Sequence, residues 1–150
     1  MGKRRRAREY ALKMLYASDV GQFKEADECL SQFWTLSNNC PDDIKQYAET
    51  LMRGALGHLQ AIDAIISEYI KNWTLERIAP IDRNILRLGI YELLYEALDE
   101  KIIIDEAVEI AKKYASADSF QFINAILDAV NKKYRCTVVE EKVIDGGCKA

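Results

Sequence analysis

The residues best suited to bind a ligand are cations at the start of the chain. Within residues 3–8, which we call the basic arm, there are five of them: Lys3, Arg4, Arg5, Arg6 and Arg8. Arginine can bind two phosphate oxygens at once through its planar guanidinium, and it also stacks on exposed bases. Five cations in six positions cannot share one face of a helix, so they would surround its first two turns. The arm therefore predicts contact with the backbone of a nucleic acid.

The distribution of charge supports this interpretation. Residues 1–13 hold six cations against Glu9 alone, a net charge of +5; because the whole chain carries −3, residues 14–150 carry −8. A basic arm on an acidic body is typical of proteins that bind nucleic acid. Cations at a helix N-terminus are unfavourable by about 0.3–1 kcal/mol, so we expect a counter-charge from another subunit or from RNA phosphate. On charge alone, a solvated arm that aids solubility is the alternative.

Nothing in the sequence indicates catalysis or a metal centre. There is no GxSxG, Walker, GxGxxG or HExxH motif, and these are the motifs that would place a nucleophile, a phosphate loop or a zinc ion. His58 is the only histidine, and the four cysteines, predicted to be reduced thiols, show no CxxC spacing. They are Cys29, Cys40, Cys136 and Cys148. We expect no enzyme activity, no cofactor and no metal. No apolar run reaches the length of a membrane span, so a cytoplasmic protein is expected.

The hydrophobic pattern predicts an all-α fold of about six or seven helices. Apolar residues make up 49% of the chain and there are only two prolines, which favours long uninterrupted elements. Residues 1–134 are expected to form one helical domain and residues 135–150 a tail. The longest apolar stripe is expected to be the central helix. The expected helices are one ending at Gly21, then 24–36, 44–69, 80–98, 101–115 and one that follows Asp118.

Local signals place the helix ends and exclude a strand. Pro80 is well suited to the first turn of a helix. Asp118, with Gln121 three residues later, predicts a capping box at the start of the last helix. The run 102–104 consists of three isoleucines, but the apolar spacing continues through Ile110 as in a helix. His58 falls on a face of the expected 44–69 helix.

Three segments together resemble the NusB family of bacterial transcription antitermination factors. They are RRRAREYALKMLY near the start, NWTLERIAPIDRNILRLGIYELLYE in the middle and IIIDEAVEIAKKYASADSFQFINAILDAV near the end. They stand in the family's order and spacing and cover about residues 3–134. A NusB-like domain also precedes the catalytic domain of certain ribosomal RNA cytosine methyltransferases. The chain stops where that catalytic domain would begin, so the resemblance favours the free-standing factor.

The resemblance implies a fold of two small helical bundles and a role in transcription. Such proteins bind the boxA element of nascent ribosomal RNA together with NusE, a small-subunit ribosomal protein. The complex joins NusA, NusG and RNA polymerase and suppresses premature termination. The basic arm matches the family's arginine-rich RNA-binding segment. Asp118 and Phe122 match further RNA-contacting positions, and Tyr16 and Asp82 match positions that face NusE.

Other interpretations of these residues stay open at this stage. Phe122 lies on the apolar stripe of the last helix and Tyr16 closes the stripe of the first, so both could pack inside the protein. Asp118 could act only as a helix cap. The sequence departs from the family's pattern at Gln121, where a basic residue is common, and at 114–115, where Tyr-Ala replaces Phe-Gly. The rival functions are a helical homodimer whose arms lie on the partner's acidic surface, and a separate RNA-targeting methyltransferase domain. A DNA-binding helix-turn-helix is a weaker third.

Overall fold

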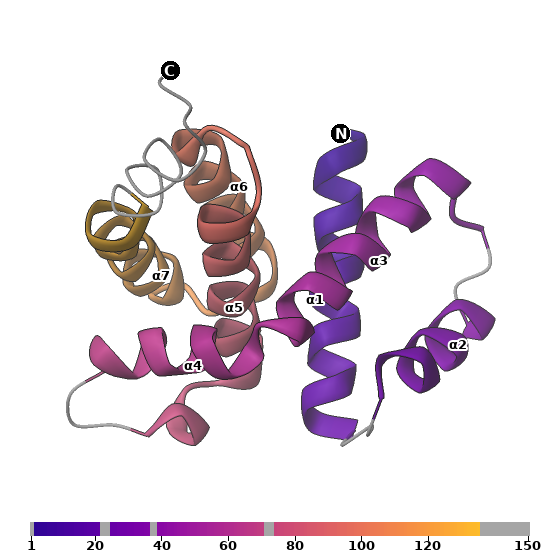
Figure 1. The fold of residues 1–150 in the computed structure, drawn as a ribbon, viewed down its shortest axis with the longest axis horizontal. Helices are drawn as coiled ribbons and strands as arrows, with labels where there is room; N and C mark the ends of the chain where they lie inside the picture. The colour runs from indigo at the N-terminus through magenta and orange to yellow at the C-terminus, as the bar shows by residue number, and fades with distance from the viewer. Residues whose placement is uncertain (1, 22–24, 37–38, 71–73, 136–150) are drawn as a thin grey trace, which may run out of the picture.

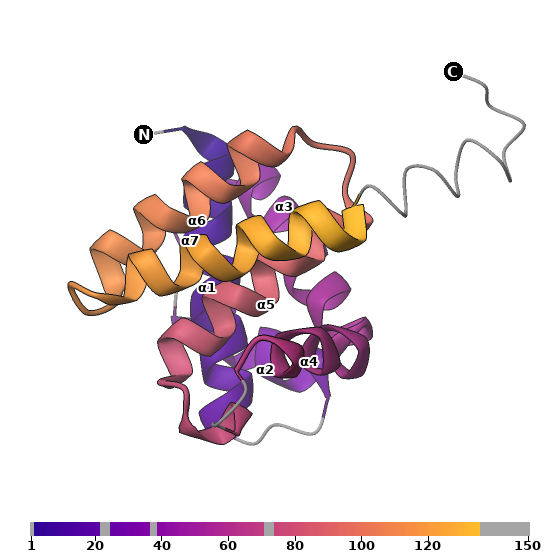
Figure 2. The same cartoon turned by 90° about the vertical axis from the view of Figure 1, so that its left-hand side faces the viewer.

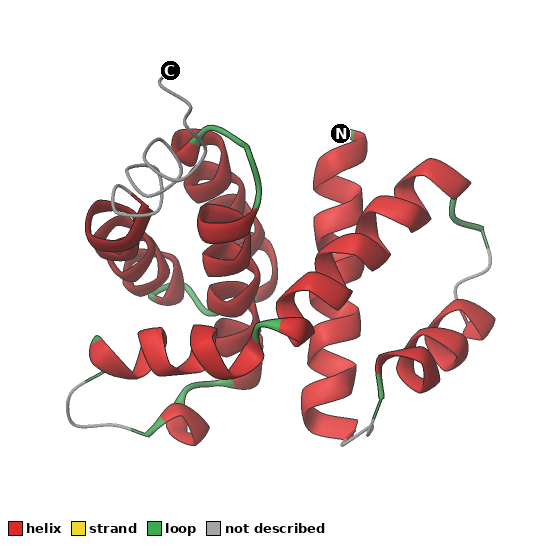
Figure 3. Cartoon of the chain, in the orientation of Figure 1, coloured by secondary structure: helices red, strands yellow, loops and turns green. Residues whose placement is uncertain are grey.

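The computed structural model describes residues 2–21, 25–36, 39–70 and 74–135, and most of these residues are helical. No strand occurs in those ranges (Figure 3). The prediction of an all-α fold is therefore confirmed, and the isoleucine run at 102–104 is helical. The expected tail lies outside the described residues except for Arg135. No described helix is long and apolar enough to cross a membrane.

The described residues form seven α-helices in two groups that lie side by side (Figure 1). One group contains α1 to α3, and the other contains α4 to α7 with two short turns. The first group is α1 (Lys3–Gly21), α2 (Ala26–Leu36) and α3 (Asp42–Gly57). The second is α4 (Leu59–Glu68), the 3₁₀ turn η1 (Leu75–Arg77), α5 (Pro80–Tyr95), α6 (Glu100–Tyr114), α7 (Ser119–Val130) and the π turn η2 (Asn131–Arg135).

Helix α5 is the centre of the molecule. It contacts α1 and α3 of the first group and α4, α6 and α7 of its own. Its side chains Leu86, Ile90 and Leu93 are at most 1% exposed, and burial of such side chains is the main favourable term in folding. Figure 2 shows α6 and α7 lying across α5. The expectation that the 44–69 helix would be central was wrong, because a helix buried on all sides carries a nearly continuous apolar pattern rather than one stripe.

The expected 44–69 helix is two helices that meet at His58. The backbone of His58 has φ −116° and ψ 21°, which lies outside the α-helical region, and it follows Gly57, a residue of low helix propensity. Its ring stacks on Tyr95 with the centroids 3.8 Å apart. The apolar stripe continues across the break because both halves face the core, so spacing alone could not reveal the change in direction. His58 is therefore not a helix-face residue.

The sequence predicted the start of α5 correctly, but it predicted the wrong cap for α7. Pro80 begins α5 as predicted. Asp99 caps α6, and its side chain accepts a hydrogen bond from the backbone N–H of Lys101 at 2.8 Å. Asp118 occupies the cap position of α7 but makes no side-chain capping bond. The predicted capping box with Gln121 was thus wrong, because Asp118 itself has helical φ and ψ, whereas a capping residue is normally extended.

Gly54 provides a test of how tightly the two groups pack. A Cβ added at Gly54 would lie 2.2 Å from the ring of the buried Tyr91. We expect Gly54→Ala to lower the free energy of unfolding by about 1–3 kcal/mol, because the ring must move within a packed interior. Urea denaturation measures this. Gly57→Ala is the matched control, since its Cβ would meet nothing within 4 Å, and it should be neutral or stabilising. Equal effects of the two changes would contradict the packing described.

Candidate nucleic-acid interface

The basic arm is not a free tail, because it forms the first two turns of α1. Lys3 and Arg4 lie toward α3. The ammonium of Lys3 is 2.8 Å from Asp43, and the guanidinium of Arg4 lies 5.8 Å from the centre of the Tyr47 ring. Both cations are exposed. The Lys3 hydrogen bond holds the pKa of Asp43 below its ordinary value.

Arg5 contacts α6 and Arg8 contacts α5. Arg5 binds Glu106 through two hydrogen bonds of 2.8 and 2.6 Å, and this keeps the pKa of Glu106 below its ordinary value. Arg8 binds Glu92 of α5 with its side chain only 3% exposed, and that of Glu92 is 2% exposed. Burial raises the pKa of Glu92, and the bonds from Arg8 oppose the rise. Arg8 was predicted to contact RNA as part of the arm, but its side chain is buried against Glu92.

The counter-charge for the arm comes from the same chain. We expected another subunit or RNA to supply it, but Asp43, Glu92 and Glu106 already do so for three of the five cations. Among the described residues, neither Arg4 nor Arg6 lies within ion-pair distance of a carboxylate. These two arginines are therefore the members of the arm most available to an outside phosphate.

Arg6 opens onto a small hollow in the face of α1. The hollow has a volume of about 160 Å³ and is lined by Arg6, Glu9, Tyr10 and Lys13. Glu9 accepts hydrogen bonds from Tyr114 at 2.7 Å and Lys113 at 3.0 Å. Burial raises the pKa of Glu9, but these bonds outweigh it and leave the pKa below its ordinary value. The carboxylate is thus neutralised within the protein.

The second candidate RNA contact, at Asp118 and Phe122, follows directly from the last turn of α6. That turn carries Lys113 and Tyr114, both bonded to Glu9 of α1, so α6 joins this region to the arm. Asp118 is exposed, and Phe122 is half-buried and packs against the core. Both the packing and the contact interpretations of Phe122 are therefore compatible with its position.

The two candidate partner-binding residues lie in different surroundings. Tyr16 on α1 is 40% exposed, so it does not belong to the core. Asp82 on α5 is half-buried and accepts a hydrogen bond of 2.9 Å from Ser119, the neighbour of Asp118. Its other carboxylate oxygen is buried, with no hydrogen-bond partner among the described residues. The bond to Ser119 places the candidate partner site directly beside one candidate RNA site.

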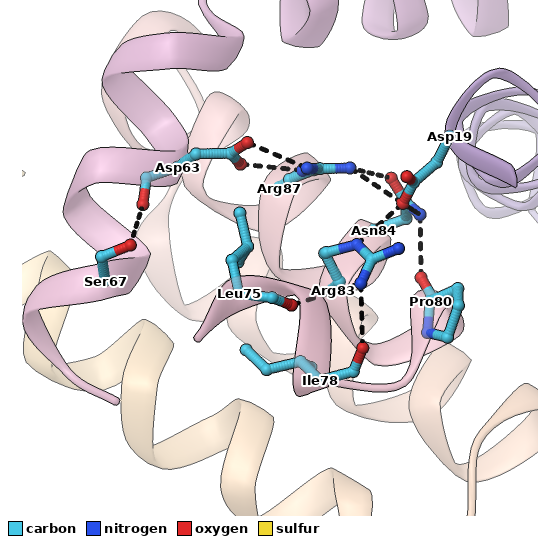
Figure 4. Close-up of polar contacts among 9 residues, drawn as sticks. All are labelled: Asp19, Asp63, Ser67, Leu75, Ile78, Pro80, Arg83, Asn84 and Arg87. Atoms are coloured by element: carbon cyan, nitrogen blue, oxygen red, sulfur yellow. Dashed lines mark hydrogen bonds and ion pairs between the residues drawn. The ribbon is translucent and has the colours of Figure 1, made fainter. Parts of the chain in front are cut away.

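Sequence reasoning missed a polar network that joins the two helix groups (Figure 4). Arg87 on α5 bonds Asp19 of α1 at 3.0 Å and Asp63 of α4 at 2.8 Å. Arg83 and Asn84 also bond Asp19, at 2.8 and 2.9 Å. The signal was present in the two arginines on a mostly apolar helix. The network borders a cleft of about 620 Å³ between the groups.

Asp19 is the acceptor on which this network converges. Burial raises its pKa, but the hydrogen bonds from Arg83 and Asn84 and the charge of Arg87 outweigh that effect, so the pKa of Asp19 is lowered overall. Asp19 is therefore ionised at neutral pH and fixes the end of α1 against α5. Among the described residues no group of three potential metal ligands occurs, and Cys29 and Cys40 are free thiols.

Comparison with known proteins identifies the family. The model of the NusB family matches residues 5–132. The chain belongs to the NusB family. A transcription antitermination protein NusB from Thermodesulfovibrio yellowstonii is 41% identical over 143 residues, covering 89% of this chain and 95% of that protein. One from Anaeromyxobacter dehalogenans is 42% identical, covering 85% and 89%.

Solved NusB structures have the same fold. The T. maritima NusB structure matches with a TM-score of 0.80 at 36% identity, covering 88% of this chain and 92% of that one. A crystal structure of antitermination factors NusB and NusE in complex with dsRNA matches with a TM-score of 0.79 at 29% identity, covering 88% and 98%. The NusB resemblance drawn from three sequence segments is thus confirmed.

The buried ion pair between Arg8 and Glu92 allows a test of whether Arg8 maintains the fold. We expect Arg8→Met to lower the free energy of unfolding by about 3–5 kcal/mol, because Glu92 would stay buried without its partner. The double variant Arg8→Met, Glu92→Leu should recover most of the loss. Chemical denaturation measures both. Arg53→Met, which breaks an exposed pair with Asp27, should cost little. An equally small cost for Arg8→Met would show that the pair is not structural.

The lowered pKa values of Asp19, Glu9 and Glu106 predict acid sensitivity. A depressed pKa contributes stability above the pKa of the unfolded chain, and that stability is lost as the pH falls through the folded pKa. The free energy of unfolding should therefore fall between about pH 5 and pH 2. Asp19→Asn should be less stable at pH 7 and should lose less on acidification.

Denaturation curves at several pH values measure this effect. The control is Asp128→Asn, which alters an exposed pair with Lys132 and should keep the wild-type acid response. If Asp19→Asn loses as much stability on acidification as the wild type, the network does not hold Asp19 ionised.

Proposed function

We propose that this protein is a non-catalytic transcription antitermination factor that binds boxA RNA of nascent ribosomal RNA transcripts together with NusE. It then joins NusA, NusG and RNA polymerase in the cytoplasm and suppresses premature termination. The relatives that match nearly the whole chain are named transcription antitermination proteins. One structural relative is a complex of NusB, NusE and RNA. These similarities support the proposal together with the arm.

The observation that carries the proposal is that the cations of the arm lie in different environments. Arg4 and Arg6 have no carboxylate partner among the described residues, while Lys3 and Arg5 hold theirs at or near the surface. A phosphate can bind the first two directly and can replace the carboxylates of the other two. Arg8 supports the arm from inside by fixing α1 to α5. Its role is then to position the arm, not to touch RNA.

The region of Asp118 and Phe122 would supply base preference. A carboxylate accepts a hydrogen bond from a base amino group and repels phosphate, so Asp118 discriminates between bases and does not anchor the backbone. Stacking of a base on an aromatic ring is worth about 1–3 kcal/mol, and Phe122 has part of its ring accessible. Gln121 is exposed beside it and adds no charge, so the arm carries more of the affinity.

The acidic body suits a cationic partner such as a ribosomal protein. Residues 14–150 carry a net charge of −8, and complementary charge speeds association. Tyr16 and Asp82 are the proposed NusE contacts. The homodimer alternative is less favoured, because carboxylates of the same chain already neutralise much of the arm. The methyltransferase alternative is less favoured because the chain covers 95% of a relative named as an antitermination protein.

The test is a titration of labelled boxA RNA and a scrambled RNA at several salt concentrations, with and without NusE. We expect tighter binding of boxA, an increase with NusE and a salt slope of about 0.7 per phosphate contacted. The double variant Arg4→Gln, Arg6→Gln should weaken binding about ten-fold or more and reduce the salt slope, with unchanged stability.

The matched control is Arg77→Gln, an exposed arginine on η1 at the opposite end of the molecule from the N-terminus (Figure 1). It should bind RNA like the wild type. If neither RNA binds even with NusE present, the proposed function is wrong. Sedimentation of the RNA-free protein then decides whether it is a dimer that uses the arm.

A further inference from the structure

A second surface rich in cations and aromatic rings extends from the arm toward α2 and α3. It consists of Arg6, Tyr10, Lys13, Trp34 and Lys45, and we call it the Tyr10 patch. The RNA-binding residues proposed above include only Arg6 of these. Its members come from three different helices, so only the fold brings them together.

The rings of the patch are fixed against one another. Tyr10 lies 5.5 Å from Trp34 between ring centres, and it meets Phe33 edge-on at 6.1 Å. Aromatic pairs at these separations stabilise each other beyond the area they bury. Tyr10 and Trp34 are both half-buried. The patch is thus a rigid aromatic platform with part of each ring accessible.

Cations lie over the same rings. The ammonium of Lys13 is 5.9 Å from the centre of the Tyr10 ring, and that of Lys45 is 5.4 Å from the Trp34 ring. Among the described residues, Arg6, Lys13 and Lys45 make no ion pair within 4.0 Å. The nearby carboxylate of Glu9 is already bonded to Lys113 and Tyr114. The patch therefore carries uncompensated positive charge on a chain whose net charge is −3.

We propose that the Tyr10 patch binds a single-stranded RNA segment that flanks the segment held by the arm. This inference rests on the proposed function. Alternating cations and aromatic rings bind single strands because phosphates contact the cations while bases stack on the rings. The hollow beside Arg6 and Lys13 is also lined by Tyr10 and leaves space for a base. The flank contributes affinity with little sequence preference, since stacking tolerates any base.

The experiment compares the full chain binding boxA RNA with and without a flank of about eight uridines on either side, a length within the usual range of such platforms. A flank on one side should tighten binding about five-fold or more. Lys13→Gln with Lys45→Gln should abolish that gain and leave the affinity for unextended RNA within about two-fold. Arg77→Gln should retain the gain. Thermal melting checks that the variants are folded.

Two further measurements separate the contributions of phosphate and base. An abasic flank keeps the phosphates and loses the bases, so it should give only part of the gain. A 4-thiouridine placed in the flank should crosslink to peptides that contain Tyr10 or Trp34. If unextended RNA binds but neither flank tightens binding, or if the gain survives in the lysine variant, the inference is wrong. If no RNA binds at all, the proposed function fails and this inference fails with it.

Discussion

The buried ion pair between Arg8 and Glu92 is the constraint on which the rest of the structure depends. It fixes the first two turns of α1 to the central helix α5 in an environment almost without solvent. A buried charge is tolerated only when its partner is present, so the register of α1 on α5 is narrowly defined. That register in turn brings Arg5 to Glu106 and Glu9 to the end of α6. The arm proposed here to bind RNA is therefore held in place by this contact.

The network around Asp19 fixes the other end of α1 to α5. Arg87 joins α1, α4 and α5 through two carboxylates, so the two helix groups are connected by polar contacts of defined geometry as well as by apolar packing. Helix α1 is thus held at both ends. The separate placement of its cations, some inward and some outward, follows from this double attachment.

The fold class and most helices could be predicted from the sequence, because apolar spacing directly reports which face of a helix is buried. The break at His58 could not, since the same face stays buried on both sides of it. The composition of the arm led to the prediction that it binds RNA. Composition could not say that Arg8 is internal while Arg6 is not, because neighbouring positions on a helix differ in environment only once the packing partner is known. The partners Glu92 and Glu106 are distant in sequence. The network of Asp19, Asp63 and Arg87 was missed for the same reason.

The arm's place within α1 has an entropic consequence. Arginine-rich segments that are disordered when free must lose backbone freedom on binding, at about 1–2 kcal/mol per residue ordered. Here residues 3–8 are already helical and their helix is packed against α3, α5 and α6. Their backbone conformation is set during folding, so an RNA bound as proposed would meet a preorganised backbone and association would need no ordering of the arm's backbone. In the proposed complex the arm would therefore serve as a template of fixed backbone conformation to which a flexible single strand adapts.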